Sequence, residues 1–381
     1  MSAPAIWNAK ISSEISAKDG MVVVESIWGP RRYDVTRVPI TVLVCDEARA
    51  VSQDFRVFID LVKATHTQEG ARERKALIGH SDLVSSLAFT QDGKFLISGS
   101  HDRTARVWKV STGEVLHVLK GHSDQVAAVA AAGKVGRIAT GSADGTIRLW
   151  DLSTGKQLHS FRMSGPQLND VRCICMTDDA SLVLGANMSG LLCAWETSSK
   201  KSVLSITAHP GECRGLALAP GGSTLLTGGH DGTLRLWSLT ERNETRRIIA
   251  HGHPIHGVAI SPDGKTFASA GADGWVKFWD ANRGEELTLP APERPFIELH
   301  TRLVADVTFS ASGLYAYSAA GSTREFGGEV RIWDVRNHRM ITQLPVIPDG
   351  AFSVAISPDS RLLAAGGEDG KVHLWDLPER L

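Results

Sequence analysis

Two clusters in this sequence combine residue types that bind metal ions. His251, His253 and His256 lie within six residues of one another, and Cys173 and Cys175 place two thiols on one face of a predicted strand. Imidazole and thiolate groups are typical zinc ligands. However, the three histidines occupy different positions of the repeat described below, and no fourth ligand accompanies the thiols. We therefore interpret both clusters as structural and predict no metal site.

Serine, histidine and aspartate, the residue types of a nucleophilic triad, also recur together along the chain. They recur at least four times at one spacing, whereas an enzyme needs its active site once. The sequence has no Gly-Lys-Ser/Thr phosphate loop, no Gly-x-Ser-x-Gly elbow and no His-Glu-x-x-His motif. We therefore predict no catalytic residues and no cofactor, and we expect that the protein is not an enzyme.

The element that positions these side chains is a repeated unit, best formed at Gly141–Asp151. This stretch is typical of a strand end, an Asp-Gly turn and an alternating strand that closes on Trp-Asp. Related stretches end at seven tryptophans, spaced by 42, 45, 42, 42, 54 and 42 residues: Trp108, Trp150, Trp195, Trp237, Trp279, Trp333 and Trp375. Every unit but the last has four strand patterns, the last has three, and none shows a helical period. Seven equal units predict an all-β, seven-bladed propeller.

The units resemble WD40 repeats. Gly79-His80 and Gly121-His122 match the Gly-His of that family. Trp-Asp pairs stand at positions 150–151, 279–280, 333–334 and 375–376. The resemblance covers residues 71–381, about four-fifths of the chain, and implies a seven-bladed WD40 β-propeller.

The residues ahead of the repeats are predicted to form a small β-rich N-terminal extension over 1–68. They include β-leaning runs such as Val22–Val24 and a turn-like stretch at Gly29–Arg32. The propeller is expected to occupy 69–381. Residues 71–79 have the character of a fourth strand, which the last unit lacks, so we expect them to close the ring and remove an exposed edge.

In the WD40 family, a buried network links a His, a Ser or Thr, the turn Asp and the Trp of a blade. The resemblance implies this network for four units, because each has the full set of donors and acceptors. The four sets are His80/Ser98/Asp102/Trp108, His122/Thr140/Asp144/Trp150, His209/Thr227/Asp231/Trp237 and His251/Ser269/Asp273/Trp279.

Three units depart from this pattern. The third has Gln167 and Gly185 where the His and the Ser or Thr belong, and the sixth replaces the Asp turn with Gly321–Gly328. The seventh has Ile347 and Ala365 at the His and Ser positions. We expect these three units to form the softer part of the ring, because fewer buried hydrogen bonds hold them.

Recurrent contact positions on one face of WD40 propellers lie three and five residues after the His and just before the turn Asp. The resemblance carries these positions onto this chain, where loops are the usual place for binding residues. The candidate partner-binding residues are His101, Asp170, Arg172, Glu212, Arg214, His230, His256, Phe352 and Glu368. Other such positions carry small or neutral residues: Ala127, Ala143, Pro254, Ala272, Leu303, Ala305 and Gly350.

Two neighbouring units share an acid followed by an arginine, as Asp170/Arg172 and Glu212/Arg214. Two adjacent arginines are suited to gripping a carboxylate or phosphate of a partner. Alternatively, they neutralise the two acids within the ring, and both alternatives stay open here. Phe352 is expected to act as an apolar anchor for a partner peptide or loop.

The overall composition does not indicate a nucleic-acid or membrane partner. The 381 residues carry a formal net charge of −1, with no extended basic stripe and no apolar run long enough to span a bilayer. Five cysteines at irregular spacing argue against a disulfide framework. With no signal-peptide pattern at the N-terminus, we expect a cytoplasmic protein.

These observations predict a non-catalytic protein–protein interaction scaffold. An alternative is a regulatory or substrate-recognition subunit of an enzyme complex, with any activity in the N-terminal module or in a partner. Against a catalytic module, residues 1–68 contain a single histidine, His66, and a single cysteine, Cys45. Binding of a small molecule or glycan in the central channel is a third possibility.

Overall fold

A computed structural model gives the fold of the chain. The structure describes residues 21–26, 29–34, 71–163, 169–288, 299–321, 327–345 and 347–378. The chain divides into two compact units, Met1–Gly70 and Ala71–Leu381.

The first unit contributes one antiparallel strand pair to the described residues. Strand β1 (Met21–Ser26) pairs with β2 (Gly29–Asp34), and Val22 lies opposite Tyr33. The prediction of a turn at Gly29–Arg32 was wrong, because these residues form most of β2. Pro30 is tolerated there since each strand of a two-stranded sheet is an edge strand. The rest of the predicted N-terminal extension lies outside the described residues.

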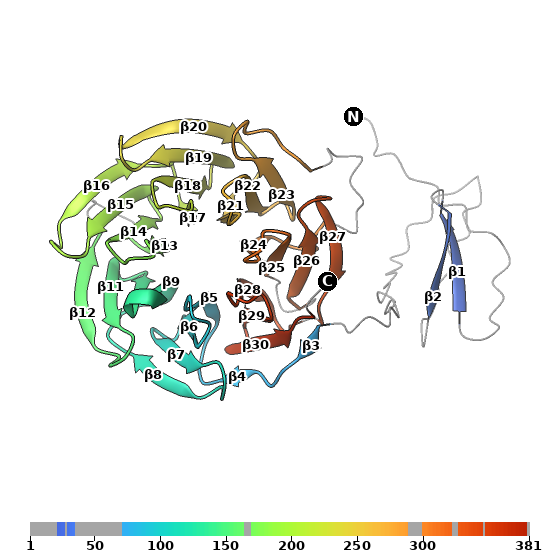
Figure 1. Ribbon diagram of the computed structural model, residues 1–381, viewed down its shortest axis with the longest axis horizontal. Helices are drawn as coiled ribbons and strands as arrows, with labels where there is room; N and C mark the ends of the chain where they lie inside the picture. The colour runs from blue at the N-terminus through green and yellow to red at the C-terminus, as the bar shows by residue number, and fades with distance from the viewer. Residues whose placement is uncertain are drawn as a thin grey trace, which may run out of the picture. The chain divides into compact units, whose positions relative to one another are not determined.

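The second unit is a ring of seven sheets, which confirms the predicted seven-bladed propeller (Figure 1). Blade 1 contains β5 (Val84–Phe89), β6 (Phe95–Ser100), β7 (Ala105–Lys109) and β8 (Val115–Leu119). Blade 2 contains β9 (Val126–Ala132), β10 (Arg137–Ser142), β11 (Thr146–Asp151) and β12 (Gln157–Arg162), with the 3-10 helix η1 (Gly133–Val135). Blade 3 contains β13 (Val171–Met176), β14 (Leu182–Asn187), β15 (Leu191–Glu196) and β16 (Ser202–Thr207).

The remaining blades continue the same antiparallel order. Blade 4 contains β17 (Cys213–Leu218), β18 (Thr224–Gly229), β19 (Thr233–Ser238) and β20 (Asn243–Ile249). Blade 5 contains β21 (Ile255–Ile260), β22 (Thr266–Gly271) and β23 (Val276–Asp280), and blade 6 contains β24 (Val304–Phe309), β25 (Tyr315–Ala320), β26 (Glu329–Asp334) and β27 (Arg339–Gln343). Blade 7 contains β28 (Ala351–Ile356), β29 (Leu362–Gly367), β30 (Lys371–Asp376), β3 (Arg72–Glu73) and β4 (Leu77–Ile78).

Blade 5 differs from the four strands expected of its unit. Its sheet has three strands among the described residues, and beyond them a single bridge joins Trp279 to Glu286. Residues 289–298 lie outside the described part of the chain.

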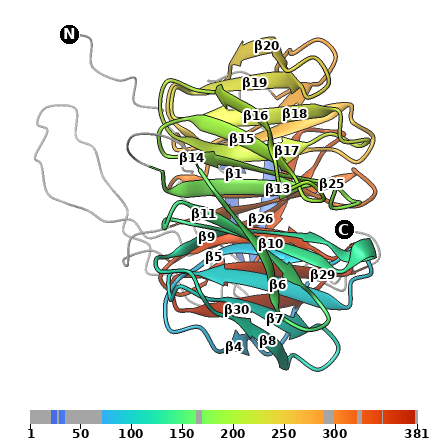
Figure 2. The ribbon, with the colours of Figure 1, turned by 90° about the vertical axis from the view of Figure 1, so that its left-hand side faces the viewer.

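The core of the propeller lies between blades rather than at the centre of the ring. Seven apolar clusters each join two neighbouring blades, and the large tryptophans Trp108 and Trp333 are almost fully buried in two of them. Small residues allow the close approach: a Cβ at Gly141 would lie 2.7 Å from a methyl carbon of Val171 in the next blade. In the side view the strands run across the ring from one face to the other, so loops gather on two faces (Figure 2).

The ring is closed by residues from opposite ends of the propeller sequence. Both β3 and β4 pair with β30, with Glu73 opposite Trp375 and Leu77 opposite Val372. Between these strands, the Arg74 amide donates to the Leu374 carbonyl at 2.8 Å. The β30 edge is thereby covered by backbone hydrogen bonds, which leaves blade 7 with a paired outer side.

Candidate functional site

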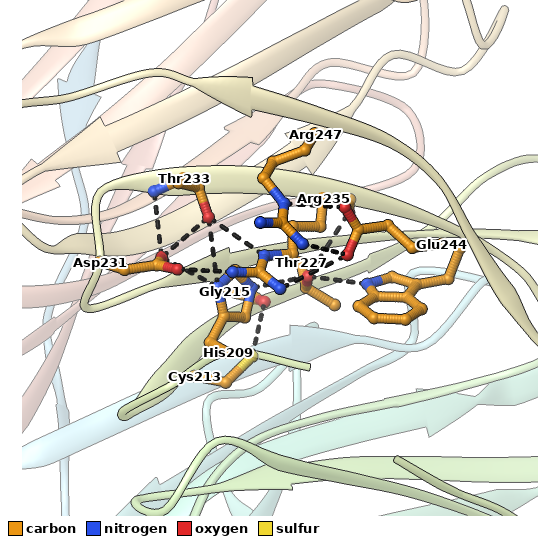
Figure 3. A network of polar contacts seen from close by, with 10 residues as sticks. His209, Cys213, Gly215, Thr227, Asp231, Thr233, Arg235, Glu244 and Arg247 are labelled. Carbon is orange, nitrogen blue, oxygen red and sulfur yellow. Dashed lines mark hydrogen bonds and ion pairs between the residues drawn. The ribbon is translucent and has the colours of Figure 1, made fainter. Parts of the chain in front are cut away.

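Buried polar networks hold the loops of one face, and blade 4 shows the arrangement (Figure 3). His209 Nδ1 contacts Asp231 Oδ1 at 2.9 Å, and Nε2 contacts Thr227 Oγ1 at 2.8 Å. Burial lowers the pKa of His209, so the imidazole is neutral and donates through Nδ1 to the carboxylate. The Thr227 oxygen accepts the Trp237 indole N–H at 3.0 Å. This chain of bonds fixes the turn before β19 and with it the neighbouring His230.

The same contacts occur in blades 1, 2 and 5, the other three for which the network is implied. In blade 1, His80 contacts Asp102 at 2.8 Å and Ser98 at 2.7 Å, and the Trp108 indole donates to Ser98 at 2.8 Å. Equivalent bonds link His122, Thr140, Asp144 and Trp150, and likewise His251, Ser269, Asp273 and Trp279. The Ser98 hydroxyl is fully buried and already bonded, so it is not placed to attack a substrate.

Blade 6 completes its network with an acid that the sequence interpretation missed. The Asp turn is absent, but Glu329 Oε2 lies 2.7 Å from His300 Nδ1, and Ser318 joins His300 to Trp333 as in the other blades. Glu329 is the first residue of β26, four before the tryptophan, where blade 1 has Thr104. The longer glutamate side chain therefore reaches the histidine from the strand instead of from the turn.

Blades 3 and 7 keep less of the network. In blade 3, Gln167 lies outside the described residues, and Asn187 Oδ1 caps the turn by accepting from the Ser189 amide at 3.1 Å. In blade 7, the Trp375 indole nitrogen is buried and has no hydrogen-bond partner in the described part of the chain. The Tyr317 hydroxyl is also buried and unpaired, and it belongs to the same apolar cluster as Trp375. Both groups lie in the cluster that holds Ala365, at a position where every other blade except blade 3 has a serine or threonine.

Replacing Ala365 with serine is expected to stabilise the protein by about 1 kcal/mol, because the new hydroxyl gives a buried indole N–H an acceptor. Urea unfolding measured by tryptophan fluorescence will report the change. Ala364→Ser is the matched control: it adds the same hydroxyl to the same strand on the side of the next cluster, which has no unpaired indole. We expect the control to destabilise, and a lower midpoint for Ala365→Ser would contradict the prediction.

The loops of this face surround a central cavity of about 480 Å³. Five candidate partner-binding residues line it: His101, Arg172, Arg214, His256 and Phe352. The residues Ala127, Leu303 and Ala305, which the sequence analysis set aside, line it as well. The other four candidates do not reach the cavity wall: Asp170, Glu212, His230 and Glu368.

The two arginines at the cavity mouth share one carboxylate. Arg172 Nε lies 2.8 Å from Glu212 Oε1, and Arg214 Nε lies 3.0 Å from the same oxygen. Asp170 is more distant, at 3.7 Å from Arg172. These contacts match the alternative in which the arginines neutralise acids within the ring. Arg214 contacts Glu212 while its side chain stays 40% exposed, so part of its guanidinium group faces solvent.

The histidines at the mouth are neutral near pH 7. Burial, and then the charge of Arg214, lower the pKa of His256 to about 4. Its Nδ1 therefore accepts a hydrogen bond from Arg214 Nη1 at 3.2 Å. Burial also lowers the pKa of His101. The charge of the mouth is therefore carried by its arginines and carboxylates.

Asp306 lines the cavity and was missed by the sequence analysis. Its carboxylate accepts from the amides of Val307 at 2.8 Å and Val354 at 3.0 Å, which joins blade 6 to blade 7. Burial raises the pKa of Asp306 to about 6. A signal was available: Asp306 lies six residues after His300, and Ser86, at the same distance from its own histidine, accepts the next blade's amide in the same way.

A second hollow, of about 580 Å³, adjoins the cavity at blades 5, 6 and 7. Its apolar wall is formed by Ala272, Leu299, Leu303 and Phe352, and Gly321 lies behind the Phe352 ring. Leu303 and Phe352 also line the central cavity, so the two spaces are continuous. Phe352 was predicted from the sequence, but the hollow beside it was not.

The metal-binding residue types behave as structural groups where the structure describes them. His251 is part of the blade 5 network, and Cys173 donates to the Cys213 carbonyl at 3.3 Å. Burial raises the pKa of the Cys175 thiol. Across the described ranges, no three His, Cys, Asp or Glu side chains are grouped closely enough to hold a metal ion. In the same ranges, no helix combines the length and apolarity needed to cross a bilayer.

Comparison with known proteins agrees with the fold. The family model described as WD domain, G-beta repeat matches residues 72–109, 113–151, 200–238, 243–280 and 344–376. The chain belongs to the WD40-repeat family. The matches cover the repeats of blades 1, 2, 4, 5 and 7. Blades 3 and 6, whose turns lack the aspartate, are the two WD40 blades without a match.

Two curated relatives share short stretches with this WD40 protein. The small ribosomal subunit protein RACK1y of Oryza sativa subsp. japonica is 37% identical over 82 residues, which is 22% of this chain and 24% of the relative. Protein groucho of Drosophila melanogaster is 32% identical over 83 residues, which is 20% of this chain and 11% of the relative. The chain therefore spans about a quarter or less of the length of these relatives.

Proposed function

We propose that this protein is a non-catalytic scaffold that binds segments of other proteins on the loop face of its propeller, meaning the face that carries the mouth of the central cavity. The observation that carries the proposal is the continuity of the cavity and the apolar hollow on that face, through Leu303 and Phe352. A concave surface with an apolar wall and a few polar groups is typical of a binding site.

The arrangement of the polar residues supports binding rather than catalysis. The Ser, His and Asp side chains that superficially offer a triad are bonded to one another, and the buried Ser98 hydroxyl also accepts from the Trp108 indole. The loop positions differ from blade to blade, which suits recognition of an asymmetric partner. Membership of the WD40-repeat family also supports a binding function. A cytoplasmic location and protein rather than nucleic-acid partners are part of this proposal.

The test is quantitative affinity purification of the full chain with both mouth arginines reversed, Arg172→Glu and Arg214→Glu. We expect the double variant to lose the proteins that the unaltered chain captures, because it replaces two positive charges at the cavity mouth with two negative charges. Lys200→Glu with Lys201→Glu is the matched control, since it makes the same charge change at the turn between β15 and β16. Unchanged capture by the arginine variant, with a normal melting curve, would overturn the proposal.

A further inference from the structure

The apolar hollow has a fixed wall. The Phe352 ring rests against the bare backbone of Gly321, where a Cβ would lie 2.8 Å from the ring. Leu299, Leu303 and Ala272 complete the wall. The small side chain of Ala272 leaves space within the hollow. A volume of about 580 Å³ is ample for a large side chain, and such pockets typically bury most of what they bind.

Three polar residues of the hollow, Asp273, His300 and Thr301, are bonded within the protein, and a fourth, Arg302, is exposed to solvent. The Asp273 carboxylate contacts His251 Nδ1 at 2.8 Å and accepts from the Trp275 amide at 3.1 Å. His300 is held between Glu329 and Ser318, and burial lowers the pKa of His300 to about 4, so it is neutral. An apolar group that enters the hollow would gain from burial against its apolar wall.

The rim next to the hollow has the opposite character. Arg214 lies on the wall of the adjoining cavity, with Nε on Glu212 and Nη1 on His256. Glu212 Oε1 is shared with Arg172, which also lies 3.7 Å from Asp170, and the Arg214 side chain stays 40% exposed. A carboxylate of a ligand would meet the exposed part of the Arg214 guanidinium group here, and arginine is well suited to bind it.

We infer that the segment bound on the loop face belongs to a partner protein and carries a bulky apolar side chain for the hollow and an acidic side chain for Arg214. This inference rests on the proposed function and adds the chemistry of its partner. One continuous segment can reach both places, because the hollow and the cavity share Leu303 and Phe352.

The experiment is selection of binders to the immobilised full chain from a displayed random-peptide library. We expect the enriched peptides to combine a Leu, Ile, Met or aromatic residue with a nearby Asp or Glu. Their affinity is then measured against Ala272→Phe, which fills the hollow while leaving the arginines in place. We expect binding to weaken about thirtyfold, the loss typical of removing a central anchor.

Ala143→Phe is the matched control. Ala143 occupies the same position as Ala272, directly before the turn aspartate, and its amide makes the same kind of bond, to Gln125 as Ala272 bonds to Pro254. It lines neither the hollow nor the central cavity. We expect full affinity for this variant. Arg214→Gln should weaken binding about tenfold and reduce its dependence on salt.

Three outcomes would overturn the inference. These are enriched peptides that are basic or lack an apolar residue, affinity that survives Ala272→Phe, and self-association of the chain through the hollow in place of peptide binding. Peptides whose affinity is unchanged by Ala272→Phe but is lost when Arg172 and Arg214 are replaced would overturn this inference and leave the proposed function standing. Capture of partner proteins that is unchanged by the Arg172→Glu and Arg214→Glu double variant would overturn the proposed function itself.

Discussion

Deletion of residues 71–79 from the full chain is expected to abolish the cooperative unfolding transition of the propeller. These residues hold β3 and β4, which cover the edge of β30. Leu77 is 7% exposed and shares an apolar cluster with Trp108, so the deletion also opens the contact between blades 7 and 1. A ring that is open at one joint exposes an unpaired strand edge and loses the mutual support of its end blades.

Urea unfolding followed by tryptophan fluorescence and circular dichroism checks this expectation. The deletion should turn a steep transition into a broad one with a smaller slope, since slope reports the surface exposed in one step. Arg74→Ala is the control that leaves the strands in place. It removes an ion pair with Asp376 whose side chains are 43% and 41% exposed, so its cost should stay below about 1 kcal/mol. An unchanged midpoint and slope for the deletion would refute the role of these strands.

The number of blades could be predicted from the sequence because each blade contains one tryptophan of a regularly spaced series. The tryptophans pack between blades at every repeat, so their spacing reports the architecture directly, even across the 54-residue gap before Trp333. The network acid of blade 6 was not predictable in the same way. Glu329 lies at the position that Thr104 occupies in blade 1, so no spacing rule distinguishes a residue that completes the network from one that merely follows it.

The candidate site was predicted in outline but not in its interactions. Counting from the histidines, from the turn aspartates and, in blades 3 and 7, from the tryptophans identified five residues of the cavity wall, because strand register carries loop positions from blade to blade. It did not show that Arg172 and Arg214 converge on Glu212, which depends on side-chain rotamers. The hollow beside Phe352 could not be predicted either, because the residues that line it come from three blades and several of them are small.

Glu329→Ala is expected to lower the free energy of unfolding by about 3–5 kcal/mol, the usual cost of breaking a buried ion pair from one side. The Glu329 side chain is 9% exposed and the Arg331 side chain 5% exposed, and their charged atoms lie 3.0 Å apart. The substitution leaves the guanidinium buried without this carboxylate and removes the acceptor of His300. Glu329→Gln keeps an oxygen near His300 and should cost less. Chemical denaturation at neutral pH measures both.

The effect of Glu329→Ala should also depend on pH. Burial alone would raise the pKa of Glu329, but the hydrogen bond with His300 and the charge of Arg331 hold it at about 2, below the 4.5 of a free glutamate. The unfolded chain therefore binds the proton first as the pH falls, so the advantage of the unaltered protein is complete above about pH 4.5 and shrinks toward pH 2. Glu285→Ala, in an ion pair that is 69–74% exposed, should cost under about 1 kcal/mol at neutral pH. Equal losses for Glu285→Ala and Glu329→Ala would show that Glu329 adds nothing as a network acid, and that blade 6 is held by its apolar cluster alone.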